Sequence, residues 1–349
     1  MRARQNREIT KEDASSTKLI IFLIEGADYK TGIERISGGI ISIVSLAEET
    51  ARLRTVHGAE VVVCTFPDQH LLDKHTLFEN NTPVFRYEQM QKYFTEVRQV
   101  LVHVPEYLTE FFLNNLVSRK LNWINTRDYC HVNILNQNVT LMPNADCLDK
   151  LKSGVDLVTI TSAHEKYCTR QFQKKYGVPL HKFGVWISPE KYYFKSYEEK
   201  ENLMVVSPDF HPAKERVLAK LNEVPKLKVQ VIQNLTYEEY RQLISRAKWT
   251  LTFGEGLDGY FIEPIFSGAV GFGVFNDIFF TQDFLECKTV YASISELADR
   301  IVNDICENNF PERFGTLQKL QFEICAKYYD REQYLKNIER FYEGKYTYV

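Results

Sequence analysis

The chain has 349 residues, of which 26% are charged, and a formal net charge of −3. This length is enough for two domains that each bury a core. A net charge near zero excludes a large nucleic-acid footprint, and no run approaches the roughly 18 to 20 apolar residues of a membrane-spanning helix. The 7 cysteines are scattered without a C-x-x-C pair. They therefore indicate reduced thiols in a cytoplasmic protein rather than disulfides or a zinc site.

The first half of the chain alternates buried apolar runs with segments of helical periodicity. Residues 1–17 are polar and basic, lack the apolar core of a signal peptide, and are predicted to be a disordered tail. The predicted strands are 18–24, 59–65, 82–86, 99–104, one strand within 121–141, and 156–161. The predicted helices are 40–51, 88–98, 109–120 and 163–176.

The second half repeats this alternation after a polar, tyrosine-rich linker at 189–202. The predicted strands are 203–207, 226–232, 248–253, 268–275 and 289–292, and the predicted helices are 213–222, 237–247, 261–268, 295–307 and most of 317–342. Thr236 and Glu239 have the spacing of a capping box. The pattern predicts two doubly wound α/β domains, 18–195 and 196–328, with a helix in 329–349 that returns to the first domain.

The stretch 252–264 (TFGEGLDGYFIEP) carries the strongest functional signal. It joins a predicted strand to a predicted helix, and its three glycines permit a tight turn and a close approach of the backbone to a ligand. A glycine loop at a helix N-terminus suits an anion. Glu255 and Glu263 could each hold a vicinal diol, because a carboxylate accepts two hydrogen bonds. Alternatively, both glutamates only stabilise the start of the helix.

The spacing of Glu255 and Glu263 resembles the E-x7-E motif of retaining glycosyltransferases with the GT-B fold. The run Tyr176-Gly-Val-Pro179 with Lys182 is similar to the end of the first domain in that family, and 236–268 is similar to its second domain. The resemblance implies two Rossmann-like domains facing across a cleft. It also implies transfer of a sugar from a nucleotide diphosphate sugar that is bound mainly by the second domain.

The resemblance also implies roles for individual residues of this stretch. Glu263 would hold the ribose hydroxyls, and Glu255 would hold hydroxyls of the donor sugar at the catalytic centre. Backbone N–H groups, including those of Gly259 and Tyr260, would face the sugar and the diphosphate. Asp258 stands where the family usually has a second glycine. It either shifts the loop by one residue or adds a carboxylate that selects the donor sugar.

The family places cations and a second glycine loop around the diphosphate, whose charge must be neutralised as the glycosidic bond breaks. Lys214 and Arg216 lie at about the position of the family's cations, although the expected spacing is not kept. Ordinary solvated residues in a first helical turn are the alternative. Ser37-Gly38-Gly39 resembles the glycine loop of the first domain, and a plain tight turn explains it nearly as well.

Histidine and carboxylate candidates lie in the first domain. His103 ends a predicted strand where the family often has a histidine near the reacting carbon, and a buried structural histidine is equally consistent with the sequence. His164 is a weaker candidate of the same kind. An inverting transferase or a nucleotide-sugar epimerase on the same fold would need a base among Glu25, Asp28 and His103.

The partner predictions follow from the same resemblance. The chain contains no D-x-D triplet, so we expect no metal and no other cofactor, with the nucleotide sugar as co-substrate. The acceptor would be a glycan or a lipid-linked hydroxyl in polysaccharide or glycan assembly, and the sugar a hexose or deoxyhexose. The helix ending at Arg119 and Lys120 could contact the inner face of a membrane. A non-catalytic partner that binds a nucleotide or glycan is a further alternative, and the oligomeric state is left open.

Overall fold

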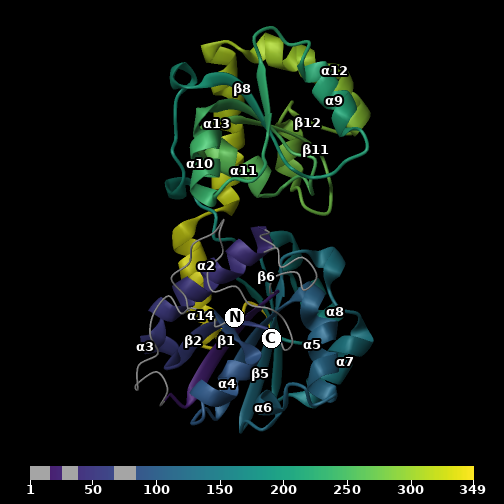
Figure 1. Cartoon of the computed structure of the whole chain (residues 1–349). Helices are drawn as coiled ribbons and strands as arrows, with labels where there is room; N and C mark the ends of the chain where they lie inside the picture. Colours follow the sequence, from purple (N-terminus) through teal and green to yellow (C-terminus); the bar gives the residue numbers. More distant parts are fainter. Residues whose placement is uncertain (1–15, 26–37, 67–83) are drawn as a thin grey trace. The chain divides into compact units, whose positions relative to one another are not determined.

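The computed structural model describes residues 16–25, 38–66 and 84–349 (Figure 1). Contacts divide the chain into two compact units. Unit 1 contains the described residues up to Trp186 together with Glu332–Val349, and unit 2 is Ile187–Arg331. The sequence analysis placed the first boundary at 195/196, so it assigned 187–195 to the other domain. This segment belongs to unit 2 because the N–H group of Lys195 donates to the carbonyl oxygen of Ser267 at 3.2 Å.

Within the described residues, unit 1 is built on a seven-stranded parallel sheet of order β3-β2-β1-β4-β5-β6-β7. The strands are β1 (Lys18–Ile24), β2 (Glu60–Thr65), β3 (Val84–Arg86), β4 (Gln99–Pro105), β5 (Tyr129–Asn136), β6 (Leu157–Ser162) and β7 (Leu180–Lys182). The helices are α2 (Gly38–Arg52), α3 (Arg54–His57), α4 (Tyr87–Tyr93), α5 (Thr109–Val117), α6 (Asn122–Asn125), α7 (Ala145–Gly154) and α8 (Arg170–Tyr176), with α14 (Arg331–Tyr342) added from the far end of the chain. The order is that of a doubly wound fold.

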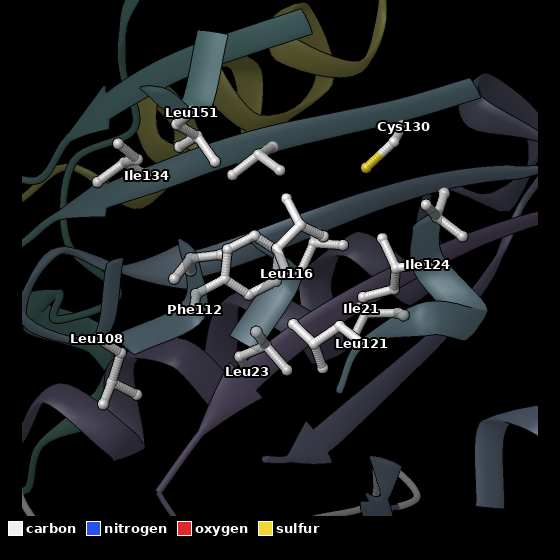
Figure 2. Close-up of a cluster of buried hydrophobic side chains, with 14 of the residues drawn as sticks. Ile21, Leu23, Leu108, Phe112, Leu116, Leu121, Ile124, Cys130, Ile134 and Leu151 are labelled. Carbon is white, nitrogen blue, oxygen red and sulfur yellow. The ribbon is translucent and has the colours of Figure 1, made fainter. Parts of the chain in front are cut away.

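Alternation along the strands gives the unit 1 sheet two different faces. One face is apolar: Ile21, Val102 and Ile134 pack against Phe112 and Leu116 of α5 in a continuous cluster (Figure 2). The intervening residues of the strands point to the opposite face, which is partly polar. This polar set, which is fully or nearly fully buried, consists of His103, His131, Asn133, Thr159, Thr161 and His181.

Unit 2 is built on a parallel sheet of order β12-β11-β10-β8-β9. Its strands are β8 (Glu201–Val206), β9 (Lys228–Val231), β10 (Ala247–Leu251), β11 (Val270–Val274) and β12 (Val290–Tyr291). Its helices are α9 (Lys214–Leu221), α10 (Tyr237–Arg246), α11 (Gly259–Phe266), α12 (Ile294–Asn308) and α13 (Pro311–Tyr328). Helices α9 and α12 pack together on one side of this sheet, and α10, α11 and α13 lie on the other (Figure 1). The predicted fold class, two doubly wound α/β domains, is confirmed.

The sequence analysis predicted that most of 317–342 is helical and that a helix in 329–349 returns to the first domain. This region is divided into α13 and α14, and α14 packs within unit 1. Beyond α14, Tyr348 pairs with Leu180 as an antiparallel bridge. The sequence analysis also missed α7, whose N-cap Asn144 accepts a hydrogen bond from the N–H group of Cys147. No helix in the described part of the chain has the length and apolarity needed to span a bilayer.

Candidate functional site

The candidate site lies at the carboxyl end of β10, where the chain turns into α11. Asp258 is the N-cap of α11: its carboxylate accepts from the N–H group of Phe261 at 3.1 Å and from the hydroxyl of Thr252 at 3.0 Å. Asp258 is partly exposed at the surface. Crowding by protein atoms nevertheless desolvates its carboxylate and raises its pKa to about 7, and the nearby charges of Asp209 and Glu255 add to this. Asp258 thus has a local structural role that the sequence analysis did not predict.

The glycines of the loop are required by its geometry. Gly256 has φ +98°, a conformation that L side chains rarely adopt, and a Cβ atom there would collide with the ring of Phe280. A Cβ atom on Gly259 would lie 2.8 Å from Oε1 of Glu263. A Cβ atom on Gly254 would lie 2.9 Å from Oδ2 of Asp209. The loop therefore passes close to carboxylates on two sides, and side chains at these positions would displace it.

Glu263 is buried in α11 with only 6% of its surface exposed. The hydroxyl of Tyr237 donates to its Oε2 atom at 3.4 Å, and Tyr192 and Tyr237 share a contact of 3.1 Å between their hydroxyl oxygens. Burial raises the pKa of Glu263 to about 8, with a smaller contribution from Asp258 in the same direction, while the tyrosine hydroxyls oppose the shift. The carboxyl group is therefore largely protonated at neutral pH in this structure.

Glu255 differs from Glu263 in its environment, because it is exposed on the loop. The alternative, in which both glutamates only stabilise the start of the helix, is not supported, because the first turn of α11 contains no acidic residue. Tyr260, in the first turn of α11, is partly exposed and lies edge-on to Tyr240, with ring centroids 5.8 Å apart. One exposed acid and one buried acid can serve different parts of a single ligand.

Lys214 opens α9 and lies beside this loop. Its Nζ atom donates to the carbonyl oxygens of Ser207 at 2.7 Å and Asp209 at 2.9 Å, and it sits 5.7 Å from the ring centroid of Phe253. Ser207 directly follows β8 and Phe253 lies two residues after the end of β10, so the ammonium group lies at the carboxyl edge of the sheet. Partial burial lowers the pKa of Lys214, opposed by the nearby Asp209 and Glu215.

Arg216 is not brought to the loop. Its guanidinium pairs with Asp299 on α12 at 3.3 Å, and both side chains are more than half exposed. Arg216 therefore matches the alternative given in the sequence analysis, that of an ordinary solvated residue in a first helical turn. Lys214 and Arg216 therefore do not form the cation pair that the family resemblance implied.

The histidine candidates of unit 1 differ in exposure, since His103 is enclosed and His164 is partly exposed. His103 is fully buried and stacks on Phe22 with ring centroids 4.3 Å apart. Its Nδ1 atom accepts from the side-chain amide of Asn133, and its Nε2 atom lies 2.9 Å from the hydroxyl of Tyr342. Both ring nitrogens of His103 thus contact protein groups, which matches the alternative of a buried structural histidine. His164 has a pKa lowered to about 4, mainly by burial.

The glycine pair of unit 1 lies in a helix, at the start of the described segment 38–66. Gly38 and Gly39 are the first two residues of α2, and the carbonyl oxygen of Gly39 accepts from the side-chain amide of Gln137 at 3.4 Å. Ser37 and Asp28 lie outside the described residues. Glu25 directly follows β1 and is partly exposed.

Sequence reasoning missed the tyrosines around Glu263 and the acid Asp209. Tyr237 and Tyr240 lie three residues apart, the spacing of one helix face, which is the signal that could have placed them together. Asp209 follows β8, and its Oδ2 atom is buried without a hydrogen-bond partner among the described residues. The pattern of the sequence alone does not show that it approaches Gly254.

Comparisons with known proteins identify the fold. No protein-family model matches the chain, and a search of curated proteins found no match. Among solved structures, an alpha-glucosyltransferase in complex with UDP aligns with a TM-score of 0.56 and 13% identity, covering 93% of this chain and 99% of that one. The HepE protein of Anabaena in complex with UDP-glucose gives a TM-score of 0.59 and 10% identity, covering 93% and 99%. A sucrose-phosphate synthase of Thermosynechococcus elongatus gives 0.57 and 13%, covering 94% and 98%. The chain has the GT-B fold of glycosyltransferases.

Proposed function

We propose that this protein is a glycosyltransferase that moves a sugar from a nucleotide diphosphate sugar to a hydroxyl group of a glycan or lipid-linked acceptor. One observation carries the proposal: within a GT-B fold, a single strand, loop and helix hold the exposed Glu255 and the buried Glu263 at the carboxyl edge of the unit 2 sheet, the edge at which the Lys214 ammonium group also lies. The similar solved structures support UDP as the nucleotide, since two of them hold UDP or UDP-glucose.

Different residues of this site can bind different parts of the nucleotide-sugar donor. Glu263 would accept hydrogen bonds from the ribose diol, and Glu255 from hydroxyls of the sugar. Lys214 and the backbone N–H groups at the start of α11, including those of Gly259 and Tyr260, would neutralise the charge on the departing diphosphate. Asp258 would act by fixing the loop through its bonds to Thr252 and Phe261.

Retention of configuration is part of this proposal and rests on the E-x7-E spacing. The acceptor hydroxyl would attack from the face that the diphosphate leaves, and a phosphate oxygen would take its proton. We also propose that the enzyme needs no metal ion or other cofactor, acts in the cytoplasm, and transfers a hexose or deoxyhexose. Contact of α5 with a membrane surface stays a prediction, to which its exposed Phe111 and Val117 lend support.

A thermal-shift screen of nucleoside diphosphates and their sugars tests the proposal. We expect one nucleotide to raise the melting temperature of the wild type and to have no effect on Glu263→Ala. Incubation of the stabilising nucleotide sugar with candidate acceptors, followed by NMR of the product anomer, then tests transfer and its stereochemistry. If no nucleotide stabilises the wild type, the proposal is wrong. Binding without transfer or donor hydrolysis would instead favour the non-catalytic alternative.

A further inference from the structure

A buried hydroxyl without a partner lies next to Glu263. Tyr240 is only 7% exposed, and its hydroxyl makes no hydrogen bond of good geometry with any described residue, its nearest acceptor being the Glu263 carboxyl group. Buried polar groups are nearly always hydrogen-bonded, so this exception requires an explanation. The hydroxyl lies close enough to Glu263 to lower the pKa of that carboxyl group. It is therefore a donor positioned for a carboxylate that is largely neutral in this structure.

Tyr237 provides a second donor on the same helix face. Its hydroxyl already lies 3.4 Å from Oε2 of Glu263, and its ring lies 6.0 Å from that of Tyr240. Tyr192 supports Tyr237 through the contact between their hydroxyls. Two tyrosine donors stabilise an ionised carboxylate more than a neutral acid, because they donate to the charged form. The arrangement therefore fits the charged form of Glu263 better than the neutral one.

We propose that Tyr237 and Tyr240 are positioning residues that hold Glu263 in its ionised form when a nucleotide sugar binds, so that binding releases one proton from Glu263. This inference rests on the proposed function, in which Glu263 binds the ribose diol. The ionised carboxylate accepts from both ribose hydroxyls and from both tyrosines, and the proton passes to solvent. Binding of the donor thereby satisfies the unpartnered hydroxyl of Tyr240.

Several titratable or charged groups face this carboxylate from the elements around it. Asp258, the N-cap of α11, has a pKa raised to about 7 by desolvation and by Asp209, so it titrates in a neighbouring range. Arg241 of α10 acts on Tyr237 and lowers its pKa slightly, against the larger effect of burial. The remaining groups that face this carboxylate are Tyr192, Tyr237, Tyr240 and Tyr260.

Calorimetric titration of the full chain with UDP-glucose between pH 6.0 and 8.5 tests the coupling. The diphosphate diester of this probe does not change charge in that range. We expect the association constant of the wild type to rise about tenfold per pH unit below the pKa of about 8. Glu263→Gln should lose this rise while retaining any contribution from Asp258. Titration in two buffers of different ionisation enthalpy should show release of one proton by the wild type.

The tyrosine variants separate positioning from structural support. Tyr240→Phe should leave the melting temperature of the free protein unchanged or higher, because the hydroxyl has no partner there, yet weaken binding at pH 7 about tenfold. Tyr237→Phe should move the midpoint of the pH profile upward. Tyr193→Phe is the matched control, since its exposed hydroxyl donates to Glu238 instead. If the wild type binds UDP-glucose with an affinity that does not depend on pH, and Tyr240→Phe binds it equally well, the inference is wrong while the proposed function stands. Absence of wild-type binding to UDP-glucose and UDP at every pH would overturn the proposed function.

Discussion

The side-chain amide of Asn133 donates a hydrogen bond of 2.9 Å to Nδ1 of His103, and this contact fixes the state of the histidine. Since Nδ1 is an acceptor, the ring is neutral and its proton is on Nε2, which donates to the hydroxyl of Tyr342 at 2.9 Å. Tyr342 in turn contacts the hydroxyl of Thr50 at 3.0 Å. A polar chain thus connects β5, β4, α14 and α2 inside unit 1.

Tyr342→Phe should destabilise the protein although it removes a single oxygen atom. The N–H group of His103 would be left buried without a partner, which costs about 1–3 kcal/mol. Urea unfolding followed by circular dichroism measures the change. Tyr346→Phe is the control: Tyr346 lies in the same C-terminal segment and is partly exposed like Tyr342, but its ring packs against His181 and Phe341. If the two variants lower the free energy of unfolding equally, the hydrogen bonds that join Asn133, His103 and Tyr342 do not stabilise unit 1 as expected.

Unit 1 should lose stability as the pH falls below about 6.5. Its histidines that have lowered pKa values, mainly because of burial, are His57, His103, His131, His164 and His181. A lowered histidine pKa means that the unfolded chain binds more protons, so the free energy of unfolding falls as the pH drops through 6.5. Each such group contributes up to about 1.4 kcal/mol per pH unit.

The acid sensitivity of unit 1 can be measured by hydrogen exchange of its strands at pH 7.5 and pH 5. His131, with a pKa of about 4, is the most useful position to change. His131→Gln removes the titration and keeps a polar group next to Thr159. Its stability should depend less on pH than that of the wild type. A variant with the same pH dependence as the wild type would argue against burial of a neutral His131.

Glu263 should have the opposite effect in unit 2. Its pKa of about 8 lies above that of an unfolded glutamate, so the folded form binds more protons, and the free energy of unfolding should fall as the pH rises from 5 to 7. Lys200, whose pKa is lowered to about 7, adds little dependence below that pH. Compared with the wild type, Glu263→Gln should lack about 1 kcal/mol per pH unit of this decline. Equal slopes in chemical denaturation would show that Glu263 is already ionised in the free protein.

Gly256→Ala should disrupt the site, whereas Gly315→Ala should not. An alanine at residue 256 must adopt φ near +98° and place its Cβ atom against Phe280, so we expect a loss of at least about 1 kcal/mol and weaker nucleotide binding. Gly315 lies inside α13, and a Cβ atom there meets nothing within 4 Å. Alanine at residue 315 should therefore stabilise the protein by up to about 1 kcal/mol. Thermal melts with and without UDP measure both effects.

The fold was predictable because its signals are local. Continuous apolar runs gave the strands, and the predicted capping box of Thr236 and Glu239 is present at the start of α10. Helix α7 was missed because its buried residues are few: Cys147, Leu148 and Leu151. Helix 88–98 was predicted too long, since α4 ends at Tyr93. Periodicity indicates that an element exists more reliably than where it ends.

The site was only partly predictable because its environment is not local. The sequence places Glu255 and Glu263 on one loop and helix, but their different burial depends on Tyr192 and Tyr237, which lie elsewhere in the chain. Asp258 was interpreted as a mark of donor specificity, and the structure shows it capping α11. Arg216 was grouped with Lys214 by nearness in sequence, yet positions two apart on a helix face different directions.

Lys214→Met should reduce the affinity for UDP about tenfold to a hundredfold, because a charged hydrogen bond to the diphosphate is worth about 1.5–3 kcal/mol. Its Nζ atom makes contacts with two carbonyl oxygens, so one of its three donors can still reach a phosphate oxygen. Arg216→Met is the matched control: it removes an exposed pair with Asp299 at 3.3 Å and should leave UDP affinity unchanged, with a stability cost below about 1 kcal/mol. Isothermal titration at low and high salt measures both variants, and the difference between wild type and Lys214→Met should shrink with salt. If the two variants bind UDP alike, the diphosphate is neutralised by other groups, and the assignment of Lys214 is wrong.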